Sequence, residues 1–132
     1  GLCDAGARVT IYNRTLAKAR ALAQDFGCAH APLKALGDVK ARLLVNCTSL
    51  GMAPDVGSTP VPAECLYADM AVFDTVYTPP RTRLLGLAAE RGATSIDGVA
   101  MFVNQALAQF HLFTGQEARA ALMREVVVRN LG

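Results

Sequence analysis

Short apolar runs alternate along the chain with longer segments of helical periodicity. Runs over residues 8–12, 43–45 and 70–73 each end on polar side chains, which is typical of buried strands in a parallel sheet. Between them, residues 15–26 and 81–91 place apolar side chains three or four positions apart, which predicts amphipathic helices. Strands that alternate with helices of this length favour an α/β fold with a doubly wound, Rossmann-like parallel sheet.

Three of the predicted strands follow a glycine that ends a helical segment, namely Gly6, Gly27 and Gly92. Glycine in this position commonly adopts a left-handed conformation that turns the chain back toward a sheet. Residues 1–5 have the pattern of only the last turn of a helix, so the first strand and its Gly-x-Gly-x-x-Gly loop would precede Gly1. We therefore expect a truncated sheet in one partial domain, residues 1–132, which includes C-terminal helices over 98–132.

In the strand order 3-2-1-4-5-6 the absent strand is central, and its loss leaves a gap of about 10 Å because strands lie ~4.8 Å apart. We therefore expect the isolated chain to be unstable, to swap or to aggregate.

Each of these predicted helices has one apolar face. The faces comprise Leu16, Ala19, Leu22, Ala23 and Phe26 in residues 15–26, Leu84, Leu85, Leu87 and Ala88 in 81–91, and Leu122, Met123 and Val126 in 117–129.

Composition and charge exclude several classes of function. The 132 residues are 52% hydrophobic and 18% charged, and a net charge of +2 without a basic cluster argues against nucleic-acid binding. The apolar runs are far shorter than the ~20 residues that a membrane span needs, which argues against a membrane protein. The four cysteines are widely spaced and have no histidine partner nearby, which argues against a metal site and favours a reducing cytoplasm.

The turn after the first complete strand carries a candidate phosphate site. Arg14, next to Asn13, stands where an arginine accommodates the 2′-phosphate of NADP in a doubly wound sheet. A guanidinium can bind that phosphate with two charge-assisted hydrogen bonds, and Lys18 adds a second cation one turn further on. Thr15 can cap the next helix through its hydroxyl, so that first-turn N–H groups also face the phosphate. The alternative is a polar turn and a helix cap without a ligand.

Polar residues also end the later strands of the predicted sheet. Because ligands in open α/β sheets bind outside the carboxyl ends of the strands, we expect one cleft to collect these groups. Hydroxyls, amides and backbone donors suit a nucleotide or a polyhydroxylated ligand, while the lack of a nucleophile beside a histidine disfavours hydrolysis. The residues concerned are Asn13 and Arg14, then Asn46, Thr48 and Ser49, then Asp74 and Tyr77, and finally Asp97, Gly98 and Gln105.

Four segments, in this order, resemble the NADP-binding domain of the shikimate dehydrogenase family. They are Asn-Arg-Thr at 13–15, Asn-Cys-Thr-Ser-Leu-Gly-Met at 46–52, Phe-Asp-Thr-Val-Tyr-Thr-Pro at 73–79 and Asp-Gly-Val-Ala-Met-Phe-Val-Asn-Gln-Ala at 97–106. Their wording is closer to the bifunctional dehydroquinate dehydratase–shikimate dehydrogenases than to the short bacterial enzymes. The resemblance implies a cytoplasmic, NADP-dependent reduction of 3-dehydroshikimate to shikimate.

The resemblance also implies roles for individual residues. Those that would hold the adenosine and its 2′-phosphate are Asn13, Arg14, Thr15 and Lys18. Those that would line the cofactor further along are Thr48, Ser49 and Leu50, followed along the nicotinamide by Thr75, Val76, Gly98 and Met101. Tyr77 and Gln105 would bind the shikimate hydroxyls or carboxylate, although Tyr77 could instead be a half-buried aromatic and Gln105 a solvated side chain.

Two departures from the family pattern bear on these expectations. Ala100 stands where the family has the second glycine of Asp-Gly-x-Gly-Met. The family's catalytic lysine and aspartate belong to an N-terminal substrate lobe, so we predict no catalytic residue in this chain and expect that lobe as its partner. Asp74 and Asp97 are expected to cap or orient loops. Two alternatives stay open, namely a quinate/shikimate dehydrogenase of different cofactor use and a non-catalytic nucleotide-binding remnant.

Overall fold

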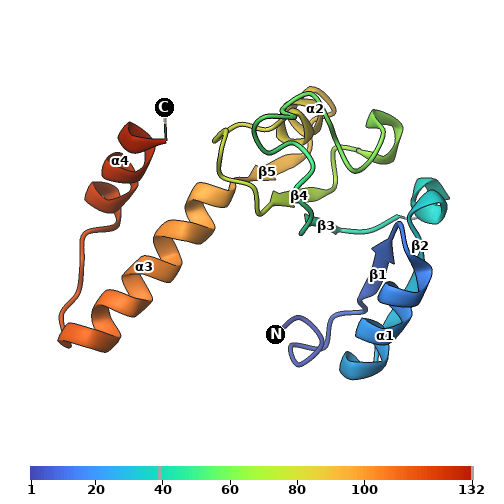
Figure 1. Ribbon diagram of the computed structural model, residues 1–132, viewed down its shortest axis with the longest axis horizontal. Helices are drawn as coiled ribbons and strands as arrows, with labels where there is room; N and C mark the ends of the chain where they lie inside the picture. The colour runs from blue at the N-terminus through green and yellow to red at the C-terminus, as the bar shows by residue number, and fades with distance from the viewer. Residues whose placement is uncertain (39, 132) are drawn as a thin grey trace. The chain divides into compact units, whose positions relative to one another are not determined.

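The computed structural model describes residues 1–38 and 40–131, which fall into two compact units, Gly1–Lys40 and Ala41–Gly132 (Figure 1). The first unit is a single βαβ motif made of β1 (Thr10–Asn13), α1 (Leu16–Phe26) and β2 (Ala29–Pro32). The two strands pair in parallel, with Thr10 opposite Ala29, as a crossover through a helix requires. A 3₁₀ helix, η1 (Leu33–Asp38), follows β2.

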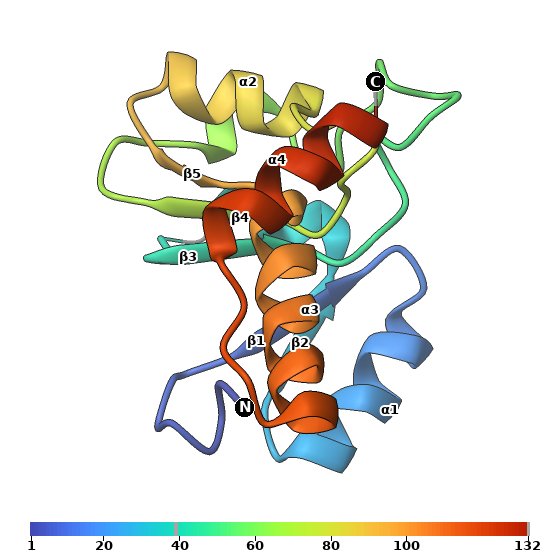
Figure 2. The same ribbon diagram turned by 90° about the vertical axis from the view of Figure 1, so that its left-hand side faces the viewer.

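The second unit contains a three-stranded parallel sheet in the order β3-β4-β5. Its elements are β3 (Leu43–Asn46), the 3₁₀ helix η2 (Ala63–Cys65), β4 (Ala71–Asp74), α2 (Arg83–Glu90), β5 (Thr94–Ile96), α3 (Gly98–Thr114) and α4 (Ala120–Asn130). Helix α2 packs on β4 and β5 and buries Leu84, Leu85 and Ala88, as its apolar periodicity predicted, while Leu87 is half-buried. Helix α3 leads away from the sheet, and α4 turns back and packs against α3 (Figure 2).

Both sheets are parallel, so the predicted α/β fold is confirmed. The first unit holds two of these strands and the second holds three, and that the sheet is truncated stays a prediction. The segment before β1 behaves as the last turn of a helix, since the amide of Ala5 donates to the carbonyl of Gly1 over 3.0 Å. That residues 1–132 make one partial domain stays a prediction, because the two units are described separately.

The three glycines that precede predicted strands all adopt the left-handed conformation. Their φ angles are 79° at Gly6, 62° at Gly27 and 75° at Gly92. At Gly27 the cap is complete, because its amide and the next one bond back to the carbonyls of the last turn of α1. The glycines therefore mark the points at which a helix gives way to a strand, as predicted.

The apolar faces of two helices differ from the prediction. In α1 the small residues Ala19 and Ala23 are buried, whereas Leu16, Leu22 and Phe26 are 46%, 45% and 59% exposed. A two-stranded sheet is too narrow to cover the larger side chains of a helix laid on it. Helix α4 begins at Ala120 rather than at Glu117, and it buries none of its described residues.

Candidate functional site

The polar turn after β1 presents two cations. Arg14 and Lys18 are both exposed, and within the described part of the chain neither has an acidic partner. The turn is shaped by Asn13, whose Oδ1 accepts a hydrogen bond from the amide of Thr15 over 2.8 Å. The predicted hydroxyl cap is wrong, because the Thr15 side chain makes no capping hydrogen bond to α1. Asn13 has taken that turn-forming role through an Asx turn, which leaves the Thr15 hydroxyl free for another partner.

In the second unit, the ends of β3 and β4 are joined by a buried pair of polar side chains. Asn46 and Asp74 lie opposite each other in the sheet, 3% and 0% exposed, and Asn46 Nδ2 donates to Asp74 Oδ1 over 2.9 Å. Asp74 also accepts a 2.6 Å hydrogen bond from the hydroxyl of Thr82, which begins α2. Buried polar groups need such partners to offset their desolvation. Asp74 therefore orients loops, as expected from the sequence.

The loop after β3 folds back on Asn46. Asn46 Oδ1 accepts from both the amide and the hydroxyl of Thr48, over 3.0 Å and 2.7 Å, and the Thr48 hydroxyl accepts from the amide of Leu50. Ser49 is exposed, and its hydroxyl has no partner among the residues that the structure describes. Thr48, Ser49 and Leu50 are therefore held as one exposed turn at the carboxyl end of the strand.

The loops after β4 and β5 approach each other closely. Thr75 binds the backbone carbonyl of Asn46 through both its amide and its hydroxyl, which ties this loop to the end of β3. A Cβ atom at Gly98 would lie 2.4 Å from the carbonyl oxygen of Val76 and 2.8 Å from that of Thr75. Only a glycine permits this approach. Thr75, Val76 and Gly98 thus lie together at the carboxyl end of the sheet, and Thr48 and Thr75 both bind Asn46 there. The predicted single cleft that also includes Asn13 and Arg14 stays a prediction.

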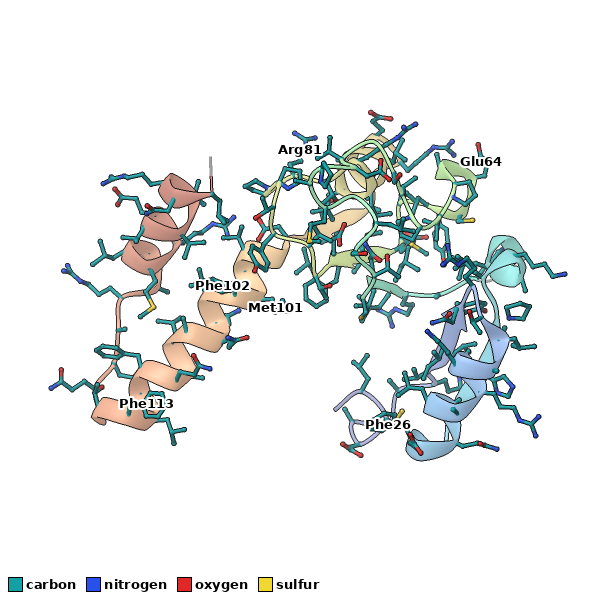
Figure 3. All side chains as sticks on the ribbon, viewed as in Figure 1. Phe26, Glu64, Arg81, Met101, Phe102 and Phe113 are labelled. Atoms are coloured by element: carbon teal, nitrogen blue, oxygen red, sulfur yellow. The ribbon has the colours of Figure 1, made fainter. Side chains whose placement is uncertain are left out.

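Tyr77 continues from this edge to the first turns of α3. Its ring stacks on that of Phe102 with centroids 5.3 Å apart and planes tilted by 33°. Both rings are more than a third exposed, and the Tyr77 hydroxyl has no partner within the described residues. Figure 3 shows Met101 and Phe102 on the half of α3 nearer the sheet. Gln105, exposed, is one helical turn after Met101, so the two share a face of α3.

The start of α3 is fixed by Asp97. Its carboxylate accepts a 2.7 Å hydrogen bond from the amide of Ala100 and caps the helix, as predicted. Arg124 of α4 donates to both carboxylate oxygens, over 3.3 Å and 2.7 Å. The hydrogen bonds from Arg124 hold the pKa of Asp97 below its usual value, although partial burial opposes them. Asp97 is therefore an ionised anchor, and its carboxylate is committed to the fold.

Three features at the carboxyl end of the β3-β4-β5 sheet were not predicted from the sequence. Phe102 was visible only as part of a motif, and its contact with Tyr77 depends on the path of a loop. Arg124 lies 27 positions from Asp97, so no local pattern links them. The Asn46–Thr48 turn did carry a signal, because Asn with a threonine two positions later favours an Asx turn.

Within the described residues, the remaining chemistry is limited. No group of three His, Cys, Asp or Glu side chains is placed to hold a metal ion. None of the described helices is both long enough and apolar enough to cross a membrane. In the second unit, hydroxyls, backbone amides and one aromatic pair lie at the carboxyl ends of the strands. The first unit offers two cations after β1. Such groups bind a phosphorylated or hydroxylated ligand and do not by themselves activate a nucleophile.

Comparison with known sequences identifies relatives of this chain. A family profile described as the shikimate 5′-dehydrogenase C-terminal domain matches residues 98–128. A shikimate dehydrogenase (NADP(+)) from Haloarcula marismortui is 49% identical over 121 residues, covering 89% of this chain and 45% of the relative. The chloroplastic bifunctional 3-dehydroquinate dehydratase/shikimate dehydrogenase of Arabidopsis thaliana is 41% identical, covering 96% of this chain and 22% of the relative. The chain thus spans about half the length of the single-function relatives it matches.

Solved structures match the fold over nearly the whole chain. Shikimate 5-dehydrogenase from Thermus thermophilus, in complex with NADP(H) and shikimate, superposes with a TM-score of 0.87 at 37% identity and covers 99% of this chain and 49% of its own. Quinate dehydrogenase from Corynebacterium glutamicum, in complex with NAD, gives the same TM-score at 30% identity, over 97% of this chain and 49% of its own. The fold is therefore shared by enzymes crystallised with either cofactor.

Proposed function

We propose that this chain, which belongs to the shikimate dehydrogenase family, is the part of such an enzyme that binds NADP during reduction of 3-dehydroshikimate to shikimate. The observation that carries the proposal is the edge of the β3-β4-β5 sheet, where Thr48, Thr75, Val76 and Gly98 meet at the strand ends. Ligands of open α/β sheets bind there. NADP, when bound, supplies or accepts the hydride. The residues of this chain hold and orient it.

The cations after β1 suit the phosphate end of the cofactor. Arg14 and Lys18 lack acidic partners among the described residues, so binding a phosphate would break no ion pair. The Thr15 hydroxyl is likewise uncommitted and can donate to a phosphate oxygen. Asn13 holds the turn that presents all three side chains. A charge-assisted hydrogen bond contributes about 1.5–3 kcal/mol, so this turn can favour NADP over NAD by roughly tenfold or more.

We assign Tyr77 and Gln105 to the substrate end of the site. Both are exposed and have a polar group without a partner in the described structure. The ring of Tyr77 is supported by Phe102, which leaves its hydroxyl free to donate to a substrate hydroxyl or carboxylate. Leu50 and Met101 add apolar surface beside the nicotinamide. We infer that the general acid and base come from an N-terminal lobe, as the resemblance to the family implies.

The test needs both halves of an enzyme. Residues 1–132 are fused behind the amino-terminal half of the Thermus thermophilus relative; we call the product the joined protein. It is expected to oxidise NADPH in the presence of 3-dehydroshikimate, and the reaction is measured as a loss of NADPH absorbance. Arg14→Ala is expected to raise the KM for NADP by roughly tenfold or more and to leave kcat nearly unchanged. Arg20 is an exposed cation of α1, outside the turn that holds Arg14. Arg20→Ala is the matched control and is expected to change neither constant.

Two results would count against the assignment. A folded joined protein that does not bind NADP contradicts the proposed function. An Arg14→Ala variant whose preference for NADP over NAD is unchanged removes Arg14 from the cofactor site alone. Tyr77→Phe is expected to weaken shikimate more than NADP, and equal effects on both would remove Tyr77 from the substrate site.

The second candidate is a quinate dehydrogenase, which the structural match to the NAD-bound enzyme from Corynebacterium glutamicum favours. Arg14 argues against strict use of NAD, because an arginine at this position suits an extra phosphate. Titration of the joined protein with NADP and with NAD measures which cofactor this chain selects. A non-catalytic remnant would bind a nucleotide without turnover. The free thiols of Cys3, Cys28 and Cys47 suit a reducing cytoplasm.

A further inference from the structure

Two of the hydroxyls expected to contact the cofactor are turned toward the protein. The Thr48 hydroxyl donates its proton to Asn46 Oδ1 over 2.7 Å, and the Thr75 hydroxyl donates to the backbone carbonyl of Asn46 over 2.9 Å. A hydroxyl has one proton to give. While these bonds are made, neither threonine can donate a hydrogen bond to a phosphate or ribose oxygen.

Both bonds converge on Asn46, whose side chain is fully used. Its Oδ1 accepts from the amide and the hydroxyl of Thr48, and its Nδ2 donates to Asp74 Oδ1 and to the carbonyl of Leu50. The bond to Asp74 spans 2.9 Å and the bond to Leu50 spans 3.3 Å. Asn46 is 3% exposed, and its bond to Asp74 is buried while its bonds to Thr48 and Leu50 are partly buried. Together the four bonds define one geometry for the turn.

Asp74 extends the same network to the neighbouring loop. Its Oδ1 also accepts from the amide of Val76 over 3.1 Å, and its Oδ2 accepts from the hydroxyl of Thr82. The Asn46–Asp74 pair therefore sets the loop after β3 and the loop after β4 together.

In the turn after β3, Ser49 differs from its neighbour. Its side chain is exposed, and its hydroxyl makes no hydrogen bond to the described residues. We propose, on the basis of the function proposed above, that Asn46 is a positioning residue that engages the Thr48 hydroxyl within the turn, and that Ser49 presents the hydroxyl that binds the cofactor. Thr48 then acts through the shape of the turn.

Three variants of the joined protein test the division of roles between Thr48 and Ser49. Ser49→Ala is expected to weaken NADP binding by about threefold to tenfold, the effect of one hydrogen bond, without altering the turn. Thr48→Val removes the acceptor of the Leu50 amide, so hydrogen exchange of that amide is expected to quicken even without NADP. Thr48→Ser restores the hydroxyl and is expected to restore both slow exchange and affinity. Thr48 is exposed, so these changes leave the core untouched.

A double-mutant cycle provides the second readout. If Thr48 acts through Asn46, the double variant Asn46→Ala, Thr48→Val binds NADP no more weakly than the worse single variant. Thr48→Val combined with Ser49→Ala is expected to be the product of the two single effects. The proposal is overturned if Ser49→Ala leaves NADP affinity unchanged, or if Thr48→Val weakens NADP while exchange at Leu50 stays slow. An unvaried joined protein that binds no NADP refutes the proposed function instead, and exchange at Leu50 still tests the turn.

Discussion

At the scale of single residues, Gly98 is the position at which added volume is least tolerated. A Cβ there would lie 2.4 Å from the carbonyl oxygen of Val76, well inside van der Waals contact. Gly98→Ala is therefore expected to push α3 away from the loop after β4 and to lower the free energy of unfolding by about 1–3 kcal/mol. Thermal unfolding of the joined protein measures the loss, and a weaker affinity for NADP is expected with it.

Gly86 in α2 is the matched control for Gly98. Its added Cβ would meet nothing within 4 Å, and alanine is the better helix former by about 1 kcal/mol. Gly86→Ala is thus expected to raise the melting temperature, while Gly98→Ala lowers it. Equal shifts in the two variants would mean that the close approach at Gly98 has no energetic weight.

The Asp97–Arg124 pair is expected to make stability depend on pH. Since Arg124 lowers the pKa of folded Asp97, the pair stabilises the protein above the unfolded pKa of about 3.9, and this contribution is lost as pH falls through the folded value. The side chains of Asp97 and Arg124 are 29% and 47% exposed, so Arg124→Ala is expected to cost only about 0.5–1 kcal/mol at neutral pH.

Urea unfolding at several pH values checks the Asp97–Arg124 pair. The difference between the unvaried protein and Arg124→Ala is expected to shrink below pH ~4 and then to vanish. Asp97→Asn keeps an oxygen for the amide of Ala100 and removes the charge, so it is expected to behave like Arg124→Ala. A difference that persists after Asp97 is protonated would assign the effect of Arg124 to packing.

Residue roles were predictable where the chain itself carries the signal. Glycine after a helix, Asp97 before one and an arginine after β1 each have a local physical meaning, and the first two are confirmed. The roles of Arg14, Tyr77 and Gln105 in binding stay predictions. Contacts between residues distant in sequence were not predicted, because no local pattern near Asp97 indicates Arg124 and none near Tyr77 indicates Phe102.

At the scale of elements, two threonines that precede helices are expected to differ in their contribution. Thr82 is 2% exposed, accepts from the amide of Leu85 and donates to Asp74, whereas Thr15 makes no capping bond to α1. Thr82→Ala is therefore expected to cost about 2–3 kcal/mol, from a lost cap and a buried carboxylate left short of a donor. Thr15→Ala is expected to change stability by less than about 0.5 kcal/mol.

Thr82→Ser keeps the hydroxyl and separates its hydrogen bonds from the packing of its methyl group. It is expected to retain most of the stability in chemical denaturation, close to the unvaried joined protein. If Thr82→Ser were as costly as Thr82→Ala, the hydroxyl would not be what anchors α2. A large loss from Thr15→Ala would show that the start of α1 depends on that side chain after all.

The elements themselves were mostly predictable from periodicity. The strands fall within a residue or two of their predicted positions, because an apolar run that ends on polar groups is a strong local signal. Burial was less predictable. Leu16, Leu22 and Phe26 share a helix face that should face a sheet, yet they are exposed because a helix buries only what its neighbours cover. Helix α4 starts three residues later than its periodicity predicted, at Ala120.

At the scale of the whole molecule, the buried apolar core is unevenly shared between the two units. Among the described residues, the unit Gly1–Lys40 buries only Ala19 and Ala23, while the core of the other unit includes Val72, Leu84 and Val99. In the described sheets, β1 pairs only with β2 and β3 only with β4, so each keeps one edge without a strand partner. Unpaired parallel edges and exposed leucines favour association with other chains.

The 132-residue chain by itself is therefore expected to lack one cooperative unfolding transition. Amides of β1 and β2 are expected to exchange almost as fast as in an unfolded chain, because little apolar surface must be exposed to open that unit, while amides of β4 exchange more slowly. In the joined protein the amides of β1 and β3 are expected to become protected, since a further strand can then occupy their edges. Hydrogen exchange with sedimentation measures both states. A monomeric 132-residue chain with a single sharp transition and equal protection in both units would contradict this expectation, because the edges would then need no additional strand.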